Sequence, residues 1–163
     1  MATGSSATRA PAQQHELLIT RVIDAPRTLV FKAWTTPEHL VRWWGPKNYT
    51  APSIKMDFRP GGSYRACIRS PEGIDEWMTG VYREIVEPER IVFTFRWEED
   101  GERGRETLVT VTFADHNGKT RLHVHQGFFE SVEQRDSHHG GWSECLDRLV
   151  ALSEAAVRGK VRL

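Results

Sequence analysis

The sequence predicts an α+β fold, in which a curved antiparallel sheet carries two short helices and one long C-terminal helix. Three patterns in the 163-residue chain predict it. Apolar residues alternate along several segments in the middle of the chain, two short segments with helix-starting signals precede them, and a long apolar stripe at helical spacing follows them. Because the turns between the strands are too short for parallel crossovers, the sheet must be antiparallel.

Length and composition indicate a single globular domain. Chains of this size usually form one domain that buries about two thirds of its unfolded surface. We expect a disordered tail at 1–14, one domain at 15–158 and a short C-terminal tail at 159–163. The tail at 1–14 is small and polar and lacks the apolar stretch of a signal peptide, which favours a cytoplasmic protein.

The charge balance argues against two classes of partner. Twenty-two Lys and Arg residues oppose twenty-two Asp and Glu residues, so the formal net charge is zero. Without a basic excess, binding to nucleic acid is not expected. Membrane insertion is not expected either, because no run of about 18 apolar residues occurs. The two cysteines, Cys67 and Cys145, make neither a disulfide framework nor a zinc motif.

The N-terminal part of the domain should contain one strand and two short helices. Branched apolar residues predict a strand at 16–23. A turn sequence with proline then starts a helix at 26–34. Thr36 supplies an N-cap hydroxyl for a second helix at 37–43, which a Gly-Pro pair ends.

Six further strands should form the rest of the sheet. Turn sequences such as Asn117-Gly118 separate segments of alternating apolar residues. In the clearest of these segments every second residue is apolar, so one face of each strand should be buried. The six segments are 49–58, 62–69, 76–86, 90–97, 107–115 and 119–126.

A long C-terminal helix should cover one face of the sheet. It is predicted at 131–154, where Ser131 and Gln134 form a capping box. At about 100° per residue, a group of mostly apolar residues falls along one line of this helix, and that stripe must pack on the sheet. The residues on the line are His138, Trp142, Cys145, Leu149 and Leu152.

Three sequence motifs, taken together and in this order, resemble those of a known superfamily. They are IDAPRTLVFKAWTTPEHLVRWWGP at 23–46, PGG at 60–62, and GWSECLDRL beginning at residue 141. The chain resembles the SRPBCC or START-like superfamily, and within it bacterial homologues of the activator of the ninety-kilodalton heat-shock protein ATPase. The resemblance implies a helix-grip fold of the Bet v-like kind, with a hydrophobic cavity between the C-terminal helix and the sheet. The resemblance indicates where a binding cavity lies, but it assigns no catalytic residues.

We expect this cavity to bind a small hydrophobic or aromatic molecule without covalent chemistry. The resemblance implies where the cavity lies, and aromatic residues predicted to face inward supply apolar surface. These residues either fill the interior as core or line a ligand site, and the sequence leaves both interpretations open. The candidate ligand-binding residues are Trp43, Phe58, Tyr64, Phe93, Phe95, Phe113, His138, Trp142, Cys145 and Leu149.

His138 is the best candidate for orienting a ligand, since it lies on the apolar line just before Gly140 and Gly141. Two glycines within a helix lower its stability by about 1 kcal/mol each relative to alanine. We therefore expect close backbone approach or a bend at the cavity mouth. Tyr64 could donate its hydroxyl to the pocket, but packing as core with the hydroxyl at the surface is favoured. Trp43 and Trp44 could gate the entrance, with one of them packed and the other near the rim, and an exposed Trp44 could instead mark a partner surface.

No metal, cofactor or catalytic set is predicted. His123 and His125 share one face of a strand, but a metal site would need a third ligand from a neighbouring element. Two alternative functions remain: a cyclase-like or hydrolase-like enzyme that uses His138 in the same cavity, and a chaperone-linked or dimer-forming interaction module. The co-chaperone activity of eukaryotic relatives belongs to a longer two-domain protein, so a chaperone partner is not favoured, while a homodimer is allowed.

Overall fold

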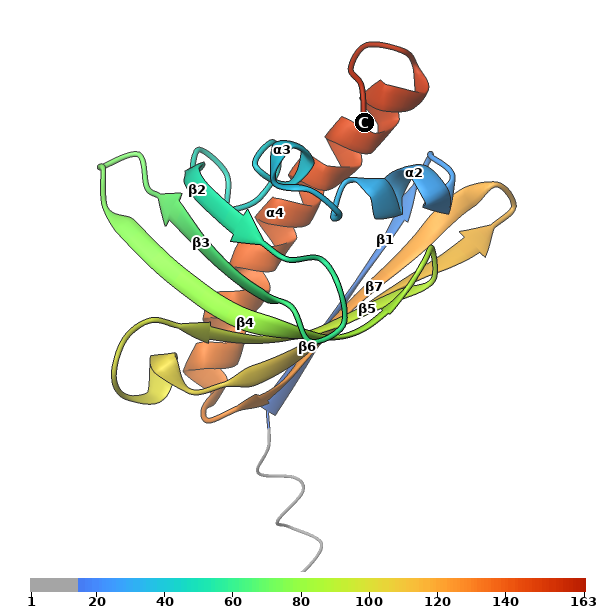
Figure 1. The fold of residues 1–163 in the computed structure, drawn as a ribbon. Coiled ribbons are helices and arrows are strands. Elements are labelled where there is room, and N and C mark those ends of the chain that lie inside the picture. The colour runs from blue at the N-terminus through green and yellow to red at the C-terminus, as the bar shows by residue number, and fades with distance from the viewer. Residues whose placement is uncertain (1–14) are drawn as a thin grey trace, which may run out of the picture.

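A seven-stranded sheet bends around one long helix, and two short helices lie between the arms of the sheet (Figure 1). The computed structural model describes residues 15–163, and the tail predicted at 1–14 lies outside them. The predicted α+β fold is confirmed. In chain order the elements are β1 (His15–Ile23), α2 (Arg27–Lys32), α3 (Pro37–Leu40), β2 (Thr50–Met56), β3 (Ser63–Arg69), β4 (Asp75–Val86), β5 (Arg90–Trp97), η1 (Glu102–Gly104), β6 (Thr107–His116), β7 (Lys119–Phe129) and α4 (Val132–Val157).

The sheet is antiparallel throughout, with the strand order β1-β7-β6-β5-β4-β3-β2. From β2 to β7 each strand pairs with the next one in the chain, and β1 pairs with β7. Asn117 and Gly118 connect β6 and β7 with φ angles of 54° and 85°, the left-handed values that a tight type I′ hairpin requires. Register shifts between β2 and β3 and between β4 and β5 mark irregularities that help to bend the sheet.

Helix α4 packs its apolar stripe against the sheet, as predicted. The Ser131 hydroxyl caps its first turn by accepting a hydrogen bond from the backbone N–H of Gln134 at 3.2 Å. The helix continues to Val157, three residues beyond the predicted end, and the chain leaves it at Gly159, whose φ is 74°. The buried residues of α4 are Trp142, Cys145, Leu146, Leu149 and Ser153.

The last residues of the chain, 159–163, return to the domain. The Arg42 guanidinium, just after α3, donates a hydrogen bond to the carbonyl of Arg162. Leu163 is partly buried against the core. The segment predicted as a C-terminal tail therefore contacts the fold, while the domain boundary at 158 stays a prediction.

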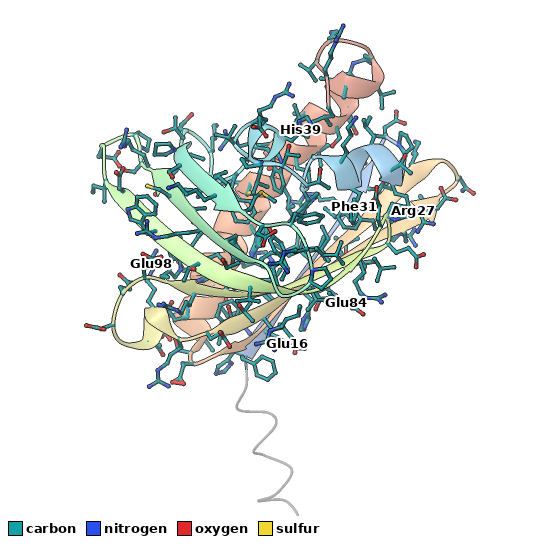
Figure 2. All side chains as sticks on the ribbon, viewed as in Figure 1. Glu16, Arg27, Phe31, His39, Glu84 and Glu98 are labelled. Carbon is teal, nitrogen blue, oxygen red and sulfur yellow. The ribbon has the colours of Figure 1, made fainter. Side chains whose placement is uncertain are left out.

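Aromatic side chains from the region of α2 and α3 fill one end of the layer between the sheet and α4. Phe31 on α2, labelled in Figure 2, is 1% exposed. Its ring meets that of Phe113 on β6 edge to face, with ring centroids 5.1 Å apart. Trp43 is fully buried, and its indole N–H donates to the carbonyl of Ala33 at 3.0 Å. Interlocking rings of this kind pack as densely as an organic crystal, so this end of the layer is core.

Both short helices end earlier than predicted, at Lys32 and Leu40 instead of residues 34 and 43. After each helix the chain tightens into turns with hydrogen bonds three residues back, such as that from Trp34 N to Phe31 O at 3.0 Å. Strand β7 is longer than predicted and reaches Phe129 instead of residue 126. The β5–β6 connection contains the short 3₁₀ helix η1, which the sequence did not predict.

Replacing Leu149 with alanine tests the contact between α4 and the sheet. Leu149 is 0% exposed, so the variant loses the transfer free energy of the side chain and leaves a cavity, and the free energy of unfolding should fall by about 2–5 kcal/mol. Leu18→Ala is the matched control, because Leu18 on β1 is 59% exposed and should cost no more than about 0.5 kcal/mol. Denaturant unfolding of both variants measures the difference; equal losses would contradict the packing described.

Candidate functional site

A cavity of about 380 Å³ lies between the N-terminal half of α4, strands β3 to β5 and the loop that joins α3 to β2. Its strand wall is mostly apolar and aromatic, with Ile68, Met78, Phe95 and Trp97. Trp142 and Cys145 form much of the helix wall. Three further lining residues on α4, Ser137, Gly140 and Glu144, are exposed, so the cavity opens to solvent beside the helix.

The two glycines of α4 sit at this opening. An added Cβ at Gly140 would meet nothing within 4 Å, and one at Gly141 would come only to ordinary contact with Pro46 at 3.9 Å. The expectation of close backbone approach at this pair is therefore wrong. At about 100° per residue, Gly141 lies near the centre of the arc that the cavity-lining residues of α4 cover. Its missing side chain leaves the mouth open.

The loop between α3 and β2 forms the third wall, and Arg148 of α4 holds it. Arg148 Nη1 lies within 3.0–3.4 Å of four carbonyl oxygens of this loop, those of Trp44, Gly45, Pro46 and Tyr49. The backbone N–H of Lys47 also donates to Glu144 Oε1 at 3.1 Å. Because hydrogen bonds to a charged donor are stronger than neutral ones, the helix fixes the loop that walls the cavity.

A buried chain of hydrogen bonds ties α4 to the sheet beside the cavity. The Trp142 indole N–H donates to Gln126 Oε1 at 2.8 Å, and Gln126 Nε2 donates to Thr107 Oγ1 at 2.8 Å. The Thr107 hydroxyl then donates to the carbonyl of Phe95 at 3.0 Å. Gln126 is completely buried, and this chain supplies partners for both ends of its amide. Trp142 and Phe95, at the two ends of the chain, both line the cavity.

His138 lines the cavity as a neutral imidazole. The Trp97 indole, which can only donate, gives its N–H to His138 Nε2 at 3.0 Å, so Nε2 must be unprotonated. Burial, with a smaller contribution from the Arg103 charge, lowers the pKa of His138 from 6.5 to about 4. The ring therefore carries its proton on Nδ1, which makes that nitrogen a hydrogen-bond donor.

Arg103, on η1, adds a charged group to the same wall. Its guanidinium carbon lies 4.0 Å from the centroid of the Trp97 ring. Its two terminal nitrogens bind carboxylates, Nη2 with Glu76 Oε1 at 2.6 Å and Nη1 with Glu99 Oε1 at 2.8 Å. Arg103 and Glu76 both line the cavity, so one wall combines a stacked cation with its counter-ion.

The structure brings four of the ten predicted site residues to this cavity: Phe95, His138, Trp142 and Cys145. Trp43, Phe113 and Leu149 are not among its lining residues and lie buried in the core. Phe58 packs beside Tyr82, with ring centroids 5.1 Å apart. Trp43, Phe58 and Phe113 therefore pack around α2 and α3, where they contribute to the stability of the fold.

Tyr64 and Phe93 line a separate small void of about 20 Å³. The buried Tyr64 hydroxyl donates a hydrogen bond to the carbonyl of Thr94 on β5 at 2.7 Å. The predicted position of this hydroxyl at the surface is therefore wrong, because it binds a backbone acceptor inside the domain. Trp44 lines both the void and the large cavity. It is 7% exposed, which excludes the exposed partner surface considered for it and makes its indole a partition between the two spaces.

Sequence reasoning missed several lining residues, notably Met78, Trp97, Tyr49 and Arg103. The sequence did indicate Trp97, because it lies two residues after Phe95 and therefore on the same face of the strand. Arg103 lies on η1, which no periodic pattern predicted, and Tyr49 lies just before β2 although the predicted strand at 49–58 included it. Their places depend on contacts far apart in the chain.

The histidine pair on β7 has other partners. His123 Nδ1 lies 2.9 Å from the Thr20 hydroxyl, and His125 Nε2 lies 3.2 Å from a carboxylate oxygen of Glu16. Within residues 15–163, no three His, Cys, Asp or Glu side chains are placed to hold a metal ion. None of the helices in that range has the length and apolar character needed to cross a membrane.

Comparison with known proteins identifies related sequences and folds. The sequence profile of the family described as "Activator of Hsp90 ATPase homolog 1-like protein" matches residues 24–154. Among solved structures, a Chromobacterium violaceum protein is 28% identical with a TM-score of 0.78, over 85% of this chain and 96% of that one. A Rhizobium leguminosarum protein is 27% identical with a TM-score of 0.73, over 86% and 95% of the two chains.

The AHSA1 protein of Silicibacter pomeroyi shares the fold, with 24% identity and a TM-score of 0.78 over 88% of this chain and 99% of that one. A search of curated proteins found no match. The profile match confirms the family resemblance that the sequence motifs indicated.

The neutral state of His138 predicts a specific loss of stability in acid. Its pKa is about 4 in the folded protein against 6.5 for the ordinary group, so between these values the unfolded chain binds more protons. The free energy of unfolding therefore falls as the pH drops from 6.5 towards 4, by about 3 kcal/mol for this group.

His138→Gln is the comparison variant, because its amide oxygen can still accept from Trp97 but does not titrate. Urea unfolding at several pH values should show that the free energy of unfolding depends less steeply on pH in the variant than in the wild type between pH 6.5 and 4. NMR titration of the wild-type imidazole should give a midpoint near 4; a midpoint near 6.5 would contradict the buried neutral ring.

Proposed function

Because the chain belongs to the Activator of Hsp90 ATPase homolog 1-like protein family, we propose that it binds a small hydrophobic or aromatic molecule in the cavity between α4 and the sheet. The protein holds this molecule without covalent chemistry. The observation that carries the proposal is the cavity itself, whose volume of about 380 Å³ lies within the usual range of small-molecule sites.

The composition of the walls supports an apolar guest. Trp44, Phe95, Trp97 and Trp142 present ring surface to the cavity, and Met78 adds a flexible thioether. Transfer of apolar surface from water into such a site contributes about 25 cal/mol for each Å² buried. Polar side chains, among them Glu76, Arg103 and His138, interrupt these walls, and polar groups placed in an apolar site are what orients a ligand.

The polar groups of the cavity support binding better than covalent chemistry. The Cys145 thiol lies 3.5 Å from the carbonyl of Trp43, and burial raises its pKa to about 12. A thiol that stays protonated is a poor nucleophile. His138 is held neutral by Trp97, so it supplies a donor at Nδ1 that can orient a carbonyl or hydroxyl oxygen of the ligand.

We also propose that the protein acts in the cytoplasm, as its two free, buried cysteines suit a reducing compartment. A homodimer stays a prediction. Light scattering measures the oligomeric state directly.

Filling the mouth of the cavity from Gly141 tests the proposal. Gly141→Leu places an apolar side chain where the cavity-lining arc is centred, and it should weaken binding of the neutral probe naphthylmethanol by about tenfold or more, measured as Kd by isothermal titration calorimetry. Gly141→Ala is the matched control and should stay within about twofold of the wild type, since its Cβ makes only ordinary contact.

Loss of folding would not explain a loss of binding in the leucine variant. Replacing a mid-helix glycine raises helix stability by roughly 1 kcal/mol, so the Tm of both variants should be at or above that of the wild type. If naphthylmethanol does not bind the wild type, or binds Gly141→Leu equally well, the cavity is not the binding site and the proposal fails.

A further inference from the structure

We infer, building on the proposed function, that the cavity selects hydrophobic organic cations, such as aromatic or alkyl ammonium compounds, over anions of the same shape. The first argument is the charge of the lining. Glu76 and Glu144 supply two carboxylates and Arg103 supplies one guanidinium, which gives a formal charge of −1. His138 adds no positive charge, because Trp97 donates to its Nε2 and requires the neutral ring.

The one guanidinium of the lining is already neutralised. Arg103 holds Glu76 at 2.6 Å and Glu99 at 2.8 Å, using both terminal nitrogens. An anionic ligand would have to displace one of these carboxylates before it reached Arg103. A cation meets no such competition, because Glu76 Oε2 and Glu144 Oε2 make no hydrogen bond within the described part of the chain.

Arg148 does not change this balance. Its Nη1 is directed to the carbonyl oxygens of the loop that walls the cavity, the nearest being Gly45 O at 3.0 Å, and Arg148 is not among the lining residues. Lys47 approaches the lining through its backbone N–H, which donates to Glu144.

The second argument is the aromatic surface of the walls. Five rings line the cavity, and the face of an aromatic ring attracts a cation within about 6 Å of its centroid. The protein itself provides an example, since the Arg103 guanidinium lies 4.0 Å from the Trp97 centroid and beside the Glu76 carboxylate. The five rings belong to Trp44, Tyr49, Phe95, Trp97 and Trp142.

The charges around Tyr49 also indicate a negative electrostatic potential at the cavity. Burial is the main cause that raises the pKa of its hydroxyl, and Glu76, Glu72 and Glu144 add to the rise while Arg103 opposes it. Three carboxylates against one guanidinium thus act on the loop wall. A negative potential at this wall stabilises a positive charge brought into the cavity.

Three naphthalene probes that differ in charge test the inference. Naphthylmethylammonium, naphthylmethanol and naphthoate present the same ring with a cation, a neutral hydroxyl and an anion. Isothermal titration calorimetry at neutral pH should rank their affinities in that order, with the ammonium compound about tenfold tighter than the alcohol. All three should be weakened by Gly141→Leu, which fills the mouth.

Two variants assign the preference to named groups. Glu76→Gln should reduce the ratio of ammonium to alcohol affinity by about fivefold, and Glu84→Gln should leave it unchanged. Glu84, labelled in Figure 2, pairs with Arg90 at 2.7 Å. It lies near the C-terminal end of β4, whereas Glu76 lies near the N-terminal end. Arg103→Gln should raise ammonium affinity several-fold, because it frees the Trp97 face and leaves Glu76 without its cation.

The outcomes separate the two proposals. If the alcohol binds and Gly141→Leu abolishes its binding, but the ammonium compound binds no more tightly or the carboxylate binds best, then the charge selectivity is overturned and the apolar site stands. A fall in ammonium affinity on Arg103→Gln would also overturn it. If no probe binds the wild type, the proposed function and this inference fail together.

Discussion

The site depends on one buried chain of hydrogen bonds that runs from Trp142 through Gln126 and Thr107 to the carbonyl of Phe95. It crosses from α4 to three adjacent strands, and its two ends are cavity walls. A buried amide without partners would cost several kcal/mol, so this chain fixes the helix at one height above the sheet. The indole of Trp142 thereby bridges α4 and β7. The separation that leaves the cavity open is thereby set by polar geometry as well as by packing.

Aromatic residues perform two different tasks in the two halves of the same layer. Around α2 and α3, rings such as Phe31 and Phe113 interlock and close the interior. At the N-terminal half of α4, strand rings such as Phe95 and Trp97 border open space, and the helix surface there includes small residues such as Gly141. Arg148 links the two halves by holding the loop that follows α3. The fold thus concentrates its hydrophobic stabilisation at one end and can leave the other end unfilled.

The sequence predicts the fold well because its signals are local. Turn pairs such as Asn117-Gly118 and the capping box at Ser131 fix where elements begin and end, and the line from His138 to Leu149 fixes which face of α4 is buried. The candidate site was predicted only where it lies on such periodic elements, as with His138, Trp142 and Phe95. Phe113 and Phe93 have the same pattern, but helices far away in sequence decide that they are core. Arg103 reaches the cavity from an irregular segment, and Tyr49 reaches it from the residue just before β2, at the end of a predicted strand, so periodicity placed neither of them there.

The glycine pair in α4 shows how stability and access are balanced in this domain. Alanine at both positions would favour the helix by about 1 kcal/mol each, and no neighbour forbids a Cβ at either one. Packing therefore gives no reason for glycine, in contrast to Gly80 on β4, where a Cβ would come within 1.9 Å of the Thr94 carbonyl oxygen. What glycine at 140 and 141 supplies is free volume beside the charged wall of Glu76 and Arg103. Within α4 only these two positions carry glycine, so the helix gives up stability at the mouth of the cavity and leaves that mouth free of side chains.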